Sequence, residues 1–124
     1  MKTICTKAAP AAIGPYSQAI VAGNILYTSG QIPLSPVTNE VVGNCIEEQA
    51  EQVMKNVGAV LEAAGSDFKK AIKTTCFLND MADFAAFNKI YANYFVSNPA
   101  RSCVAVKALP KGVLVEVEVI AGIE

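Results

Sequence analysis

The sequence of 124 residues has no histidine and no tryptophan, and only 17% of its residues are charged. The missing histidine excludes Ser-His-Asp and Cys-His nucleophile systems, histidine-ligated zinc and imidazole proton shuttles. A net charge of -1 provides no basic field that would steer nucleic acid to the protein. No apolar run approaches the ~20 residues that a membrane helix needs, and the N-terminus lacks a signal-peptide core, so we expect a cytoplasmic protein without a membrane partner.

The four cysteines are widely spaced and form no CxxC pair: they are Cys5, Cys45, Cys76 and Cys103. This spacing therefore does not indicate a metal site built on a CxxC motif or thioredoxin-like redox chemistry. An even count allows two disulfides, but a cytosolic chain with an adequate core favours free thiols. By default, each cysteine is expected to be a small buried apolar residue.

The length suits a single domain over residues 1–124, with enough chain to bury one core. Hydrophobic residues make up 52% of the chain, whereas its charged fraction of 17% falls short of the usual figure of about 25%. We therefore expect copies of the chain to cover part of one another's apolar surface. The alternative is a monomer that is simply rich in alanine and valine.

Apolar side chains recur at three- and four-residue steps in residues 46–64, which predicts a helix with one apolar stripe. Asn44 is its expected N-cap and Gly65 its expected stop. A second helix is predicted over residues 80–95, with Asp80 as the capping side chain.

The remaining segments are β-branched or alternating and predict strands over 2–6, 17–21, 25–29, 72–78, 102–108 and 113–120. The resulting order, β-β-β-α-β-α-β-β, is an α+β pattern. Two helices are too few for both faces of a sheet, so they should cover one face only. The other face would then meet another subunit.

Two acids, Glu116 and Glu118, alternate with valines in the last strand and share one of its faces. They belong either to a functional site or to a solvent-exposed face whose charges hinder aggregation. Arg101 is the only arginine in the sequence, and its planar guanidinium group can bind a carboxylate through two parallel hydrogen bonds. It should share a strand face with Cys103. The alternative is an ordinary surface arginine, paired with Glu118.

The Gly14-Pro15-Tyr16 segment fixes the backbone and could hold the Tyr16 ring over a pocket. Gly30 would let a backbone N–H approach a ligand closely. The alternative for both segments is that their glycine and proline residues simply form turns between strands.

The segments AAIGPYSQA, YTSGQIP, KTTCFLND and NPARSCV, followed by VLVEVEVIA, resemble the Rid (YjgF-like) family of reactive intermediate/imine deaminases. The resemblance runs from about Ala9 to Ala121. Arg101 matches the arginine of the archetypal subgroup, although the tract just before Pro99 is a few residues shorter than in some members.

The resemblance implies a chorismate-mutase-like mixed sheet with two helices on one face, in a homotrimer with a central barrel-like core. It also implies hydrolysis of reactive 2-imino acids, such as 2-iminopropanoate (the tautomer of 2-aminoacrylate) and 2-iminobutanoate. The products are 2-keto acids and ammonia, and the role is metabolite damage control. No metal or organic cofactor is expected, and the sites would lie between subunits.

In this interpretation Arg101 holds the substrate carboxylate and Glu116 deprotonates the attacking water. Other expected substrate-binding residues are Tyr16, Ser29, Gly30, Cys103 and, on the second helix, Asn88. Asn88 could equally be a solvated helix position. Three other functions stay open: a module that binds small carboxylates without turnover, an RNA-directed translation inhibitor and a chaperone-like holdase. A pI near 5.4 and the lack of a basic patch disfavour the RNA role.

Overall fold

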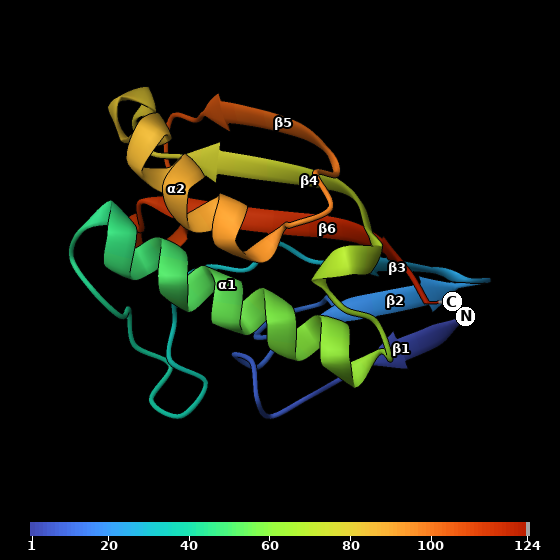
Figure 1. Cartoon of the computed structure of the whole chain (residues 1–124). Coiled ribbons are helices and arrows are strands. Elements are labelled where there is room, and N and C mark those ends of the chain that lie inside the picture. The colour runs from blue at the N-terminus through green and yellow to red at the C-terminus, as the bar shows by residue number, and fades with distance from the viewer. Residues whose placement is uncertain (124) are drawn as a thin grey trace.

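The computed structural model describes residues 1–123 as one mixed six-stranded sheet with two α-helices packed on one of its faces (Figure 1). The strands are β1 (Lys2–Ile4), β2 (Ala19–Ala22), β3 (Ile25–Thr28), β4 (Ala71–Leu78), β5 (Ala100–Ala105) and β6 (Val115–Gly122), and the helices are α1 (Ile46–Ala63) and α2 (Phe84–Tyr94). Three short 3-10 helices, Phe68–Lys70, Met81–Asp83 and Pro110–Gly112, join them. The predicted α+β class, element order and one-sided helix layer are confirmed.

The strands lie in the order β1-β2-β3-β6-β4-β5, and the β4–β5 pair is the parallel one. The last strand, β6, therefore lies near the centre of the sheet, whereas β5 is an edge strand. No helix among residues 1–123 is long and apolar enough to span a membrane.

The ends of α1 differ in how they are capped. Cys45 is its N-cap and makes no side-chain capping bond, so the prediction of Asn44 as the cap is wrong. The backbone N–H of Asn44 instead donates to the Glu48 carboxylate at 3.2 Å, because Glu48 reaches back from the first turn. The predicted stop at Gly65 is confirmed: its φ is 76°, and the N–H of Ser66 donates to the carbonyl of Leu61.

Helix α2 follows a 3-10 turn that Asp80 caps by accepting a hydrogen bond from the Ala82 N–H at 2.9 Å. Strand β5 ends at Ala105, short of the predicted residue 108, because β4, its only partner strand, ends at Leu78. Without a partner, the chain leaves the sheet after the Val106 N–H has bonded to the Leu78 carbonyl.

The alternation of β6 separates the core from the other face of the sheet. Val115, Val117 and Val119 are buried beneath the helices, whereas Glu116 and Glu118 are half-buried on the opposite face. We call this second face the open face, since no helix among residues 1–123 covers it. It also carries the partly exposed side chains Tyr27 and Val104.

All four cysteines are free thiols, as predicted. Their predicted burial holds only for Cys76, which has no exposed surface. Cys5 is exposed because it follows the edge strand β1, and Cys45 and Cys103 are partly exposed.

Candidate functional site

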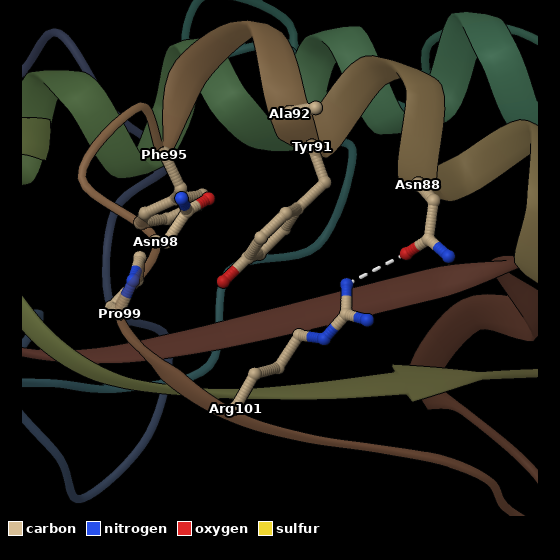
Figure 2. Close-up of a pocket in the computed structure, with 7 residues that line it drawn as sticks. All are labelled: Asn88, Tyr91, Ala92, Phe95, Asn98, Pro99 and Arg101. Carbon is tan, nitrogen blue, oxygen red and sulfur yellow. Dashed lines mark hydrogen bonds between the residues drawn. The ribbon is translucent and has the colours of Figure 1, made fainter.

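The first pocket lies between α2 and the start of β5 and has a volume of about 430 Å³ (Figure 2). We call it the arginine pocket; it is lined by Asn88, Tyr91, Ala92, Phe95, Asn98, Pro99 and Arg101. The Nη1 of Arg101 donates a hydrogen bond to the Oδ1 of Asn88 at 2.7 Å. This is the only hydrogen bond that the guanidinium makes to residues 1–123, so its other N–H groups remain available to a ligand.

Arg101 reaches the helices because of its place in β5. It is paired with Thr74 of β4, whose side chain is fully buried on the helix side of the sheet. Cys103 lies two residues further on the same face, beside Cys76. Burial raises the pKa of the Cys103 thiol, although the charge of Arg101 opposes that shift. The thiol is therefore protonated near neutral pH, which disfavours a nucleophilic role.

The second pocket lies on the open face and has a volume of about 390 Å³. We call it the glutamate pocket; it is lined by Tyr16, Ser29, Gly30, Ile32, Pro110 and Glu116. After β3 ends, the chain continues beside β6: the Gln31 N–H donates to the Val117 carbonyl at 2.8 Å, and the Val117 N–H donates back at 3.1 Å. This bridge brings the backbone of Gly30 against Glu116.

A side chain at position 30 would fit only if the Glu116 carboxylate moved away. A Cβ on Gly30 would overlap the Glu116 carboxylate, lying only 2.7 Å from its Cδ. Burial raises the pKa of Glu116, and the nearby charge of Glu118 raises it further. A carboxylate with a raised pKa is a stronger base than an exposed one, which suits a proton acceptor beside a pocket.

Tyr16 and Ser29 complete the glutamate pocket in different ways. The Tyr16 side chain, 53% exposed, lies at its edge. The Ser29 hydroxyl donates to the carbonyl of Ser17 at 2.6 Å, and its N–H donates to the carbonyl of Gln18 at 2.9 Å. Because its proton is used in this way, Ser29 chiefly holds the Tyr16 segment against the pocket.

A single copy therefore divides the predicted site residues into two groups. Arg101, Cys103 and Asn88 lie on the helix side, whereas Tyr16, Ser29, Gly30 and Glu116 belong to the open-face pocket. The predicted Arg101–Glu116 combination is not formed within one chain, nor is the alternative pairing of Arg101 with Glu118, because both acids lie on the opposite face.

The sequence analysis did not identify Tyr91, which lines the arginine pocket, as a site residue. Its three-residue spacing from Asn88 puts both residues on neighbouring turns, a signal that could have linked it to the pocket. Within residues 1–123, no three His, Cys, Asp or Glu side chains gather in a group that could hold a metal ion.

Comparison with known proteins covers nearly the whole chain. The profile of the family described as endoribonuclease L-PSP matches residues 6–123. AldR of Lactococcus lactis, whose name describes a regulator, is 56% identical over 100% of this chain and 99% of its own. The human 2-iminobutanoate/2-iminopropanoate deaminase is 47% identical over 97% of this chain and 88% of its own.

Solved structures are also similar to this chain over nearly its whole length. A structure from Thermotoga maritima, described as an endoribonuclease, has a TM-score of 0.97 at 47% identity and covers 100% of this chain and 98% of its own. Escherichia coli TdcF with bound serine has a TM-score of 0.93 at 43% identity and covers 98% of both chains. The chain therefore belongs to the endoribonuclease L-PSP family, the same Rid (YjgF-like) family that its sequence motifs resemble.

Proposed function

We propose that this protein hydrolyses small 2-imino acids to 2-keto acids and ammonia. The observation that carries the proposal is the state of Arg101, whose only hydrogen bond to residues 1–123 goes to the neutral amide of Asn88. A guanidinium without a carboxylate partner, at the wall of a pocket, is suited to binding an anionic substrate. The name of the human relative, a 2-iminobutanoate/2-iminopropanoate deaminase, supports the same substrate class.

The proposed reaction adds water to the C=N bond and then releases ammonia. Arg101 binds the substrate carboxylate and thereby fixes the position of the adjacent imine carbon. Glu116 accepts a proton from water as the water oxygen bonds to the carbon of the protonated imine, whose C=N π electrons move to the nitrogen. Glu116 then returns this proton to the nitrogen of the resulting carbinolamine, and the C–N bond breaks as the hydroxyl loses its proton to solvent, which leaves a 2-keto acid and ammonia. Backbone groups at Gly30 and Cys103 orient substrate or water, and Tyr16 closes the pocket.

This mechanism requires two copies of the chain, because Arg101 and Glu116 lie on opposite faces of one sheet. We propose a homotrimer in which the arginine pocket of one subunit faces the glutamate pocket of the next. Support comes from the low charge content and from the uncovered open face, where Tyr27 is 47% exposed and Val104 46% exposed.

A coupled assay tests the proposal. A threonine dehydratase generates 2-iminobutanoate, and the release of 2-oxobutanoate and ammonia is followed with and without this protein. Faster release by the wild type, but not by Arg101→Ala, is the expected result. Saturable binding of 2-oxobutanoate without acceleration would instead favour a carboxylate-binding module, and the absence of both would overturn the proposal.

A further inference from the structure

The aromatic ring of Tyr91 packs against the Arg101 guanidinium in the arginine pocket. The guanidinium carbon of Arg101 is 4.7 Å from the centroid of the Tyr91 ring, and 5.4 Å from that of Phe84. Figure 2 shows the Tyr91 side chain reaching from α2 toward the sheet beside Arg101. The other side of the Tyr91 ring stacks on Phe95, with centroids 4.6 Å apart. The ring is thus held between a cation and a second aromatic ring.

The hydroxyl end of Tyr91 is also held. Its oxygen lies 2.8 Å from the hydroxyl oxygen of Thr74, in a buried hydrogen bond. Thr74 is fully buried and is the β4 residue paired with Arg101. Burial raises the pKa of the Tyr91 hydroxyl, so the ring stays a neutral phenol and the hydrogen bond persists at physiological pH. One residue pair in the sheet therefore anchors both the arginine and the ring beneath it.

We propose that Tyr91, anchored by Thr74, is a positioning residue that holds the Arg101 guanidinium with its free N–H groups directed to the pocket. This inference rests on the proposed function for its catalytic meaning, although the orientation itself can be measured without substrate. An unsupported arginine loses rotamer entropy when it orders around a ligand. Stacking on Tyr91 and the bond to Asn88 impose that order before the substrate arrives.

The composition makes the test direct, because Arg101 is the only arginine in the chain. Its Nε–Hε group therefore gives one arginine side-chain signal in a nitrogen-15 NMR spectrum of the full-length protein. The variants are Tyr91→Leu, which removes the ring, and Tyr91→Phe and Thr74→Val, which each remove the anchoring hydrogen bond. Tyr94→Phe is the matched control, since the Tyr94 hydroxyl donates to Glu51 and not to the arginine pocket.

In the wild type and in Tyr94→Phe, we expect the same ring-current-shifted Arg101 signal. Tyr91→Leu should reduce that shift to the contribution of Phe84, and Tyr91→Phe and Thr74→Val should reduce it by less. In the imine assay, Tyr91→Leu should raise KM about tenfold with less than about a twofold change in kcat, because the lost order affects carboxylate binding.

An unchanged Arg101 signal in Tyr91→Leu would overturn the positioning role. If Tyr91→Leu fails to fold, an unchanged signal in both Tyr91→Phe and Thr74→Val would overturn it instead. The two proposals fail separately: a wild type that hydrolyses no imine refutes the proposed function, whereas the NMR comparison still decides whether Tyr91 orients Arg101.

Discussion

Arg101 and Glu116 extend from opposite faces of the same sheet. The strand pairing sets this relationship: Arg101 is paired with Thr74, and Glu116 with Phe77, three residues further along β4. An odd number of residues along a strand reverses the side-chain direction. One copy of the chain thus separates the carboxylate-binding group from the proposed base, and the proposed chemistry depends on how copies meet.

Complementation between inactive variants tests this shared site. Arg101→Ala and Glu116→Gln should each be inactive alone, but mixed trimers should recover roughly a third of the wild-type rate, since in a ring that holds both variants about one site in three pairs two intact residues. The measurement is imine hydrolysis by doubly tagged, co-purified assemblies. Mixed assemblies that form but show no recovery would mean that the site lies within one chain.

Replacement of the arginine separates charge from geometry. Arg101→Ala should lower kcat/KM at least about 100-fold, because it removes charge-assisted hydrogen bonds worth about 3 kcal/mol. Arg101→Lys should recover only part of that loss, since an ammonium lacks the planar fork. Thermal unfolding should stay close to wild type for both variants, as Arg101 is partly exposed on an edge strand. Full activity of Arg101→Lys would show that charge alone suffices.

A methyl group at position 30 should displace the proposed base. Gly30→Ala places its Cβ in the volume of the Glu116 carboxylate, so imine hydrolysis should fall at least about tenfold while the fold is kept. Gly122→Ala is the matched control, because a Cβ at that position would lie 3.9 Å from the Lys70 carbonyl oxygen, an ordinary van der Waals contact. Equal activity of the two variants would remove the Gly30–Glu116 contact from the mechanism.

The pH dependence of stability should report the burial of Glu116. Burial raises its pKa in the folded state above the unfolded value, so folding takes up a proton between the two values. Stability contributed by the protonated carboxyl is therefore lost as the pH rises through that window. Glu116→Gln stays neutral, so its stability relative to wild type should increase from pH 4 to pH 7 in denaturant titrations. A constant difference would contradict the raised pKa.

The pH dependence of the activity should run opposite to that of the stability. A general base must be deprotonated, so kcat/KM of the wild type should fall as the pH drops through the raised pKa of Glu116. Because the Glu118 charge contributes to that increase, Glu118→Gln should move the acid limb to lower pH. An acid limb that stays in place in Glu118→Gln would show that the two carboxyl groups do not interact.

Local patterns in the sequence determined the elements and their order. The apolar stripe of residues 46–64 predicted α1, and the alternation of valine and glutamate predicted a strand with two distinct faces, because helix and strand periods follow from backbone geometry. The motif resemblance also identified the family. Predictions were less accurate where the structure depended on distant partners, as at the end of β5, which follows the end of β4.

Tertiary structure alone decided which residues meet. The pairing of β5 with β4 directed Arg101 toward α2, and the bridge between Gln31 and Val117 brought Gly30 against Glu116. Neither contact has a local signal, since strand register is set by the packing of residues far apart in the sequence. The residue types were therefore readable from the sequence, whereas their division between two faces, and the place of Tyr91 under Arg101, came only from the fold.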